Sequence, residues 1–344
     1  MGVDAEQPVR PVARWRSALA CAAAGVPWIG ALSLAWSSRP YLLDALAQLG
    51  LLIVVVSFAI AAVLYWRGHR RAGGACAVGL GVLTALFVRA HAGGIPSTPA
   101  PGGVATSPVR VVVYNAHVDN SLNDPDLEPW LLGLDADLVC IIEPPTGFPG
   151  THPSIEAAFP HSVAGQPGMD WPVVLLSRTP FEAIELVPFA DATMFSMPAR
   201  RTLRLTTRGG AQVLFTSMYP RSLRTVGFWR DSIASVTVDA SVVRRWLADA
   251  GDDHPPLIIA GDFNATATGR THAIMRTSGL RPWSPLAGAG TFPSLLPRWV
   301  SLPLDRIWAS DGVWVKRWRV GPRMRSDHRP VVLDLEVRRP AGSG

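Results

Sequence analysis

The segment Ser326-Asp327-His328-Arg329-Pro330 places a carboxylic acid next to an imidazole, and an alternating apolar run follows at 331–337. A carboxylate can bind a metal ion or stabilise positive charge, and a neighbouring imidazole can transfer a proton near neutral pH. The same residue types also form ordinary turns. The segment therefore indicates catalysis only if other polar residues lie at the ends of other strands.

Polar residues of this kind recur in or beside the ends of apolar runs that are typical of strands. They are Asn115, Glu143, Asp262, Asn264, Asp305, Asp327 and His328. Simpler explanations exist for some of them, because Glu143 would also suit a solvated loop and Gly261-Asp262-Phe263-Asn264 a tight turn. Asp305 lies within an apolar run, where an unpaired carboxylate is costly to bury, and a histidine is its natural partner.

This set of side chains is rich in oxygen donors and contains a single histidine. Cys21, Cys76 and Cys140 show neither metal-ligand spacing nor a disulfide framework, and their pattern is typical of small apolar residues. Oxygen donors suit a hard divalent cation such as Mg²⁺ or Mn²⁺. A hard cation, amide donors and one histidine together fit the hydrolysis of a phosphate ester.

Arginines that follow two of the expected strands are candidates for binding a substrate phosphate. Arg178 follows the apolar run 173–176, and Arg221 lies in a loop with Arg224 and Arg230. Such arginines can clamp a phosphate through charge-assisted hydrogen bonds, or they can simply be solvated. The sequence leaves both interpretations open.

The N-terminal part of the chain is unusually apolar. The sequence of 344 residues is 48% hydrophobic and 17% charged, and its mean hydropathy is +0.22. Residues 17–36 and 45–66 carry no charge, and 72–88 form a shorter apolar segment; each fits the roughly 17–25 residues of a membrane-spanning helix. We therefore expect a transmembrane region of three helices at 17–91, with a buried hairpin of a soluble protein as the alternative.

The placement of arginines predicts the orientation of these helices. Arg10, Arg14 and Arg16 precede the first expected span, and Arg67, Arg70 and Arg71 lie between the second and the third. The loop between the first and second spans carries only Arg39, although Arg89 just after the third weakly opposes the pattern. The positive-inside rule then predicts a cytoplasmic segment at 1–16 and an extracytoplasmic location beyond residue 92.

Two further segments complete the expected organisation. Residues 92–107 are rich in Pro, Gly, Ser and Thr and are expected to form a linker. The apolar periodicity of residues 108–339 predicts one domain in which strands and helices alternate, with Asp126 as the N-cap of its first helix. The expected strands lie at 111–114, 138–142, 173–176, 200–207, 212–217, 257–260, 304–308 and 331–337, and the expected helices at 127–134 and 231–249.

Taken in order, the motifs of residues 109–338 resemble those of the endonuclease/exonuclease/phosphatase superfamily, whose members include the DNase I-like nucleases. The strand-end asparagine matches Asn115 in VVVYN, and the metal-binding glutamate matches Glu143 in CIIEPP, without the glutamine that usually precedes it. Four further matches are Leu176-Ser177-Arg178-Thr179-Pro180, Gly261-Asp262-Phe263-Asn264, Asp305 and Ser326-Asp327-His328-Arg329-Pro330.

The resemblance implies a four-layered α/β sandwich, in which two packed mixed sheets are flanked by helices. It implies Glu143 as the principal ligand of Mg²⁺ or Mn²⁺, with Asp327 near the metal. It further implies that Asp262 positions the attacking water, that Asn115 and Asn264 contact the metal site and the phosphate, and that His328 acts on the phosphate with Asp305.

The chain departs from the family at Met218-Tyr219-Pro220, where many members carry His-x-Pro. Methionine cannot donate a proton. Tyr219 could replace the histidine as a phosphate contact, but strand alternation predicts that its side chain points the other way.

The layout also resembles membrane-anchored bacterial members of the superfamily, among them an actinobacterial group linked to teicoplanin resistance. We therefore expect a multi-pass protein of the cell membrane that hydrolyses a phosphate ester, lipid-linked or of the envelope, outside the cytoplasm. The net charge of +6 and a short basic cluster at 316–325 also allow an extracytoplasmic nuclease. The third alternative is a catalytically weakened module that binds phosphoesters, which Met218 favours and the intact polar set opposes.

Overall fold

The computed structural model describes residues 11–36, 40–92, 94, 100–117, 124–145, 147–164, 173–184, 202–251, 254–283 and 290–339. These residues form two compact units, Met1–Ala92 and Gly93–Gly344. Parts of the expected cytoplasmic segment 1–16 and of the expected linker 92–107 lie outside the described residues.

The first unit consists of helices whose outer surfaces are apolar. They are α1 (Pro11–Ala35), α2 (Tyr41–Ala47), α3 (Gly50–Trp66) and α4 (Arg70–His91). In the described part, Trp15–Ala35 and Arg70–His91 are long and apolar enough to cross a membrane, and α2 and α3 make a third candidate only if their bend of 74° is counted within one span. The expected second span is therefore broken, at Gln48-Leu49-Gly50, where glycine disfavours a continuous helix.

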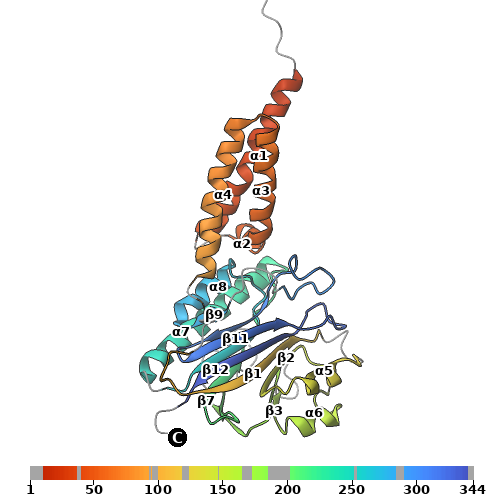
Figure 1. The fold of residues 1–344 in the computed structure, drawn as a ribbon, viewed down its shortest axis with the longest axis vertical. Coiled ribbons are helices and arrows are strands. Elements are labelled where there is room, and N and C mark those ends of the chain that lie inside the picture. Colours follow the sequence, from red (N-terminus) through yellow and green to blue (C-terminus); the bar gives the residue numbers. More distant parts are fainter. Residues whose placement is uncertain are drawn as a thin grey trace, which may run out of the picture. The chain divides into compact units, whose positions relative to one another are not determined.

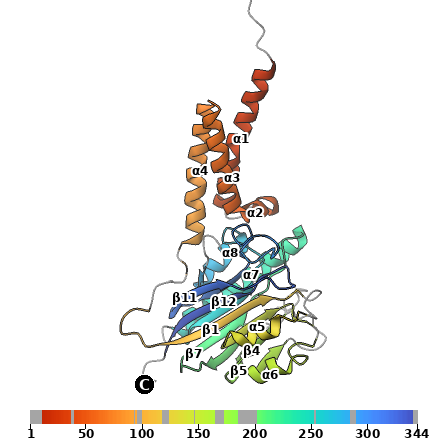
Figure 2. The same ribbon diagram turned by 45° about the vertical axis from the view of Figure 1, so that its right-hand side comes forward.

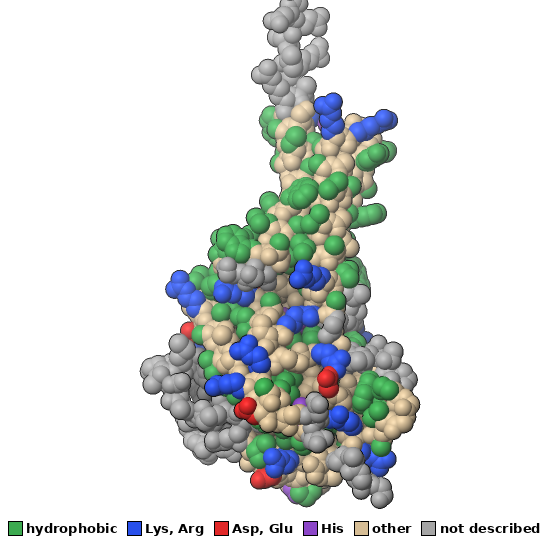
Figure 3. Space-filling model, turned by 90° about the vertical axis from the view of Figure 1, so that its left-hand side faces the viewer, with side chains coloured by type: hydrophobic (Ala, Val, Ile, Leu, Met, Phe, Trp, Pro, Cys, Tyr) green, Lys and Arg blue, Asp and Glu red, His purple; other side chains and the backbone are tan. Residues whose placement is uncertain are grey.

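Close packing holds these helices together. A side chain at Gly79 would come within 2.8 Å of the Trp28 ring, and the Trp28 indole donates a hydrogen bond to the Ala75 carbonyl at 3.1 Å. Small residues at such contacts are typical of helices that associate in lipid. Figure 3 shows apolar side chains along the length of this unit and Lys or Arg side chains at one end of it. This composition fits a membrane protein.

The second unit contains two sheets of six strands each. The first has the order β11-β12-β1-β2-β4-β3, and the second has the order β5-β6-β7-β8-β10-β9. In each sheet one parallel pair, β1 with β2 or β7 with β8, is surrounded by antiparallel pairs. The first sheet comprises β1 (Thr106–Asn115), β2 (Leu138–Ile142), β3 (His161–Ala164), β4 (Val173–Ser177), β11 (Val313–Val320) and β12 (Val331–Arg338). The second comprises β5 (Phe181–Ile184), β6 (Thr202–Thr206), β7 (Gln212–Ser217), β8 (Leu257–Asp262), β9 (Arg281–Trp283) and β10 (Asp305–Ala309).

The two sheets pack face to face through a continuous apolar core that includes Val111, Cys140, Phe215 and Ile307. Short helices α5 (Leu127–Gly133) and α6 (Pro153–Ala158) cover the outer face of the first sheet. Helices α7 (Val226–Ala250) and α8 (Arg270–Met275), with the 3₁₀ turn Arg276–Ser278, cover the second (Figures 1 and 2). The expectation of a four-layered α/β sandwich is confirmed.

Two local expectations differ from the structure. The helix expected at 231–249 begins earlier, at Val226, because the Thr225 side chain accepts a hydrogen bond from the Phe228 amide and caps it. Asp126 stands at the N-cap position of α5 but makes no capping hydrogen bond. The Asp124 carboxylate instead accepts hydrogen bonds from the amides of Asp126 and Arg325, which ties this loop to the chain before His328.

The sheet topology gathers the polar residues at one edge of the sandwich. Parallel strands β1 and β2 end at Asn115 and just before Glu143, and β8 ends at Asp262. The antiparallel neighbour β10 begins at this same edge, since Asp305 lies opposite Asp262 in the register. Strand β12 also begins there, at Val331, three residues after His328.

Candidate active site

The site is built around an imidazole held between two carboxylates. The His328 Nδ1 atom lies 2.8 Å from Asp305 Oδ2, and the Nε2 atom lies 3.7 Å from Asp262 Oδ2. All three side chains are almost completely buried. The Phe292 ring lies against the imidazole, with the ring centres 5.0 Å apart. The pairing of His328 with Asp305 is the one expected from the sequence, and it leaves Nε2 directed toward Asp262.

The backbone around His328 is fixed by a chain of hydrogen bonds through Ser326. The His328 amide donates to the Ser326 hydroxyl at 2.9 Å, and that hydroxyl donates to the Asn115 carbonyl at 2.7 Å. This ties the start of β12 to the end of β1. Sequence reasoning assigned no positioning role to Ser326, although its place within the Ser-Asp-His motif was a usable signal.

Hydrogen bonds from two asparagines orient the Asp262 carboxylate. Asn115 Nδ2 donates to Oδ2 at 3.1 Å, and the Asn264 amide donates to Oδ1 at 2.8 Å. Asn264 adopts a φ of 47°, which asparagine tolerates better than most residues, and its own side chain donates to the Pro220 carbonyl at 2.9 Å. The neighbouring Gly261 is required because a side chain there would meet the Met218 backbone.

Glu143 and Tyr219 face each other across the two sheets. The Tyr219 hydroxyl donates a hydrogen bond to Glu143 Oε1, and Glu143 adopts a φ of 49° where β2 gives way to a loop. The expectation that Tyr219 points away from the site is therefore wrong. Alternation along β7 holds, but Tyr219 shares the inner face with Phe215, and the site lies on that face. Met218 is 2% exposed and packs on the other face, toward the helices.

The side chains at this edge could hold a hard divalent cation. Glu143, Asp327 and Asn115 supply carboxylate and amide oxygens, the donors that such cations prefer. Asp327 Oδ1 is buried and has no hydrogen-bond partner among the described residues, which is costly unless a ligand completes it. Ligand atoms of Asp262, Asp305 and His328 also lie within 4.8 Å of one another and form a second candidate cluster.

Burial and charge shift the proton affinities of the site in defined directions. Burial raises the pKa of Asp262 to about 6, against the opposing effect of His328. For His328, burial by itself lowers the pKa, but the carboxylates of Asp305 and Asp262 outweigh it and raise the pKa to about 10. Burial, followed by the nearby Asp262 and Glu143, raises the pKa of Tyr219, so its phenol remains a donor at neutral pH.

The proton on His328 predicts a pH dependence of stability. Because the folded pKa of about 10 exceeds the ordinary pKa of histidine, near 6.5, the stabilisation is complete below about pH 6.5. It is lost as the pH rises through about 10. The melting temperature of the full chain in detergent and chelator should therefore fall more steeply between about pH 7 and 10 than that of His328→Gln.

The matched control for this measurement is His161→Gln. His161 lies on edge strand β3, level with the first residue of β2 through its partner Ser177. Glu143 follows the last residue of β2, so His161 lies at the end of the strands away from the site. The His161→Gln variant should retain the wild-type slope. Equal slopes for wild type and His328→Gln would contradict the prediction.

The two predicted phosphate-binding arginines lie in different places. Arg221 is close to the site, because Pro220 is hydrogen-bonded by Asn264, and its guanidinium lies 4.8 Å from the centre of the Phe228 ring. Arg178 follows β4 at the opposite end of the strands, because β4 runs antiparallel to β2. The length of β2 separates it from Glu143 by about 15 Å. Its Nε donates to the Ala136 carbonyl at 2.7 Å.

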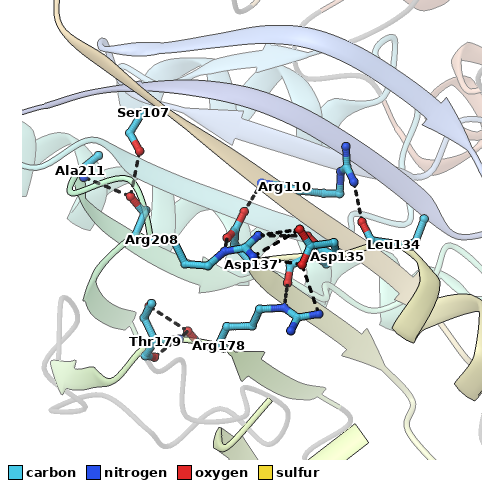
Figure 4. A network of polar contacts seen from close by, with 12 residues as sticks. Ser107, Arg110, Leu134, Asp135, Asp137, Arg178, Thr179, Arg208 and Ala211 are labelled. Carbon is cyan, nitrogen blue, oxygen red and sulfur yellow. Dashed lines mark hydrogen bonds and ion pairs between the residues drawn. The ribbon is translucent and has the colours of Figure 1, made fainter. Parts of the chain in front are cut away.

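Arg178 belongs to a separate ion-pair network, shown in Figure 4. Its guanidinium lies 3.6 Å from Asp135, and Arg208 contacts both Asp135 and Asp137 at 3.0 Å and 2.5 Å. These contacts join the loop before β2 to the β6–β7 turn, which bridges the two sheets. The position of Arg178 does not support the prediction that it binds the substrate phosphate; its contacts are structural.

The fold consists of two mixed sheets packed face to face with helices outside. A buried His–Asp pair lies among acids and amides at one end of the strands. Together these features define the endonuclease/exonuclease/phosphatase fold. The sequence matches the Endonuclease/Exonuclease/phosphatase family over residues 112–328, more than half of the chain. The chain belongs to this family. Members of the family are phosphoester hydrolases that generally use divalent metal ions.

Solved structures with the same fold are distant in sequence. A family member from Bacteroides vulgatus is 17% identical, with 67% of this chain and 100% of that chain covered and a TM-score of 0.50. One from Beutenbergia cavernae is 18% identical, with 67% and 72% covered and a TM-score of 0.48. The mannosyl-6-phosphatase Bt3783 of Bacteroides thetaiotaomicron is 18% identical, with 66% and 99% covered and a TM-score of 0.47. No curated protein matches the chain.

Proposed function

We propose that this chain is a membrane-anchored, divalent-metal-dependent phosphoesterase that acts outside the cytoplasm on a lipid-linked or envelope phosphate ester. The observation that carries the proposal is the buried His328–Asp305 pair, which faces Asp262 at the edge of the sandwich where Glu143 also lies. A cationic imidazole, an oriented carboxylate and a group of oxygen donors are the parts that phosphoester hydrolysis requires.

Glu143 and Asp327, with Asn115 beside them, are assigned to the metal, Mg²⁺ or Mn²⁺. When bound, the ion would polarise a phosphoryl oxygen and offset its negative charge. The cluster of Asp262, Asp305 and His328 is the less favourable place, because a histidine ligand must be neutral. His328 is held as a cation by Asp305, and Nδ1 is already engaged with that carboxylate.

Asp262 and His328 have complementary roles in this proposal. Asp262 accepts a proton from the attacking water, and its raised pKa brings it nearer to the range that suits a general base. His328 presents a charged N–H at Nε2 to the phosphoryl oxygens, while Asp305 fixes the ring orientation through Nδ1. The backbone amide of Asn264 donates a hydrogen bond to Asp262 and so holds this carboxylate in its orientation.

Tyr219 takes the place of the histidine that many family members carry one position earlier. Its hydroxyl orients Glu143 and lies at the site as a neutral donor. Tyr219→Phe removes that hydrogen bond without changing the ring, and we expect the apparent Mg²⁺ affinity to fall by about 10-fold, since partners of metal ligands are typically worth 10–100-fold. Isothermal titration with Mg²⁺, together with the Mg²⁺ dependence of hydrolysis, measures this.

Met218→Leu is the matched control for Tyr219→Phe. Met218 packs between β7 and the helices, and leucine conserves its volume, so both the Mg²⁺ affinity and the rate should stay at the wild-type values. An unchanged Mg²⁺ affinity in Tyr219→Phe would argue that the phenol does not support a metal ligand.

A panel of substrates tests the proposed function. The full chain in vesicles would be given a water-soluble phosphomonoester, a water-soluble phosphodiester, phospholipids, a polyprenyl diphosphate and plasmid DNA, each with Mg²⁺. Turnover of a lipid-linked ester that is lost in Glu143→Gln supports the proposal. Absence of turnover on the whole panel would favour the phosphoester-binding module instead.

Preference for plasmid DNA in the same panel would favour the nuclease. The basic cluster that suggested this alternative is partly neutralised within β11 and β12. Lys316 lies 2.6 Å from Glu336, and Arg319 lies 3.4 Å from Asp334. These pairs leave less positive charge for a phosphate backbone than the sequence alone suggests.

The extracytoplasmic location rests on the arginine pattern around the apolar helices. A C-terminal fusion to a phosphatase reporter that folds only outside the cytoplasm should be active, and the matching fusion to a fluorescent protein that folds only in the cytoplasm should be dark. The reverse pair of results would place the catalytic unit inside.

A further inference from the structure

A loop beside the active site exposes large apolar side chains. Within the stretch 290–304, Leu295 is 69% exposed and Trp299 is 71% exposed, and Leu296 and Val300 are 42% and 40% exposed. Soluble surfaces usually bury such residues or scatter them singly, so four within one short loop indicate a contact surface. We refer to residues 295–300 as the apolar loop.

The apolar loop is held in a defined conformation. The Ser301 hydroxyl lies within hydrogen-bond distance of the carbonyls of Pro293, Leu296 and Pro297, at 3.0–3.2 Å. Phe292 and Leu302 form a β-bridge at its base. The exposure of the four apolar side chains is therefore imposed by a constrained backbone.

The base of the loop is bonded directly to the catalytic segment. The Ser294 amide donates to the Asp327 carbonyl at 2.7 Å, and the Ser294 hydroxyl donates to the Ser326 carbonyl at 2.8 Å. The Arg329 guanidinium donates to the Leu296 carbonyl at 3.0 Å. Whatever the apolar loop contacts is thereby brought next to His328.

Arginines surround the apolar loop. Arg298 and Arg323 are exposed and Arg329 is half-buried, and no carboxylate of the described residues forms an ion pair with any of the three. The Arg298 guanidinium donates to the Gly321 carbonyl at 2.9 Å, two residues before Arg323, and the Arg329 guanidinium donates to the loop itself at Leu296. These contacts bring the three cations together, and burial, followed by the charges of Arg298 and Arg323, lowers the pKa of Arg329. A cluster of cations beside exposed tryptophan and leucine suits an anionic surface with an apolar interior.

The same chain carries the apolar helices that fit a membrane. The stretch between residues 92 and 106 can span at most about 50 Å even when fully extended. If these helices lie in a bilayer, the second unit is tethered within reach of its surface. Figures 1 and 2 show the loop before β10 at the same end of the second unit as the N-terminal end of α7, where Val226 and Phe228 are also exposed.

We propose that the apolar loop and its three arginines dock on the surface of an anionic lipid bilayer and bring the active site to substrates held in that bilayer. Leu295 and Trp299 would enter the boundary between headgroups and acyl chains, and Arg298, Arg323 and Arg329 would face lipid phosphates. The proposal rests on the helices lying in the membrane and does not require turnover.

Labelling the loop tests the proposal in the full chain. Leu295→Cys in a Cys21→Ala background would carry an environment-sensitive fluorophore, since Cys76 and Cys140 are buried. The labelled protein would be placed in vesicles of phosphatidylcholine alone or of equal parts phosphatidylcholine and phosphatidylglycerol. We expect a blue shift and quenching by nitroxide-bearing acyl chains that is severalfold stronger in the anionic vesicles.

Two matched variants complete the experiment. A label at Val238→Cys, an exposed apolar position about 18 Å along α7 from its N-terminal end, should show neither the shift nor the quenching. Arg298→Gln and Arg323→Gln should each weaken docking about fivefold in the anionic vesicles, the effect of roughly one surface charge. Docking should persist in the inactive Glu143→Gln variant, which separates this proposal from the proposed function.

Two results would overturn the proposal. A label at position 295 that behaves like the one at position 238 would show that the loop stays in water. A blue shift without nitroxide quenching, growing with the protein-to-lipid ratio, would show that a second copy of the chain covers the loop instead of lipid.

Discussion

His328→Gln is expected to lower kcat by about 10²–10⁴-fold on whichever phosphoester the chain hydrolyses, the range for loss of a charged donor positioned on the reacting oxygens. The buried His328 carries a proton at neutral pH because Asp305 and Asp262 outweigh the effect of burial. Glutamine can keep a hydrogen bond to Asp305 but supplies no charge. The loss should therefore appear mainly in kcat, with a smaller change in KM.

His161→Gln provides the control for nonspecific effects of removing a histidine, since His161 lies on the edge strand β3. Asp305→Asn provides a second comparison, because it keeps the imidazole but removes the charge that orients it. We expect it to lose activity by a factor between those of His161→Gln and His328→Gln. Wild-type kcat in His328→Gln would remove His328 from the mechanism.

Asp262→Asn is expected to cause a loss of similar size, about 10²–10⁴-fold in kcat, for a different reason. Both oxygens of Asp262 accept hydrogen bonds, one from Asn115 Nδ2 and one from the Asn264 amide. An asparagine side chain must direct its NH₂ group at one of these two donors, so the orientation of the side chain is lost together with the basic oxygen.

The pH profile distinguishes this loss from a structural effect. The acidic limb of kcat/KM in the wild type should reflect the raised pKa of Asp262, near 6 in the free protein. Asp262→Asn should abolish that limb in the residual activity, whereas Asp249→Asn on the exposed surface of α7 should preserve it. An acidic limb that survives in Asp262→Asn would assign the base to another residue.

Much of the fold was readable from local patterns. The apolar runs that end in Asn115, Glu143 and Asp262 are strands because β-branched and aliphatic residues buried on both faces favour them. The positions of these residues followed from the strand ends. The helix break near Gln48 was missed, because the long apolar stretch outweighed the weak helix-breaking signal of Gly50.

The contacts between distant residues could not be predicted in the same way. Arg178 follows a buried strand in sequence, as Glu143 does, yet antiparallel pairing places the two at opposite edges of the sheet. The direction of Tyr219 depended on which face of β7 the site occupies, and this is fixed by packing of the two sheets. The apolar loop had no periodic pattern that would have singled it out.

The sequence by itself determined which residues can do chemistry here, and their order and type were sufficient to predict the family and its four-layered fold. Only the tertiary structure decided that His328 faces Asp262, that Tyr219 supports Glu143, and that Arg178 serves an ion-pair network. The physical reason is that residue type fixes what a side chain can donate or accept. Strand direction, register and the face that each strand buries decide which other side chain it meets.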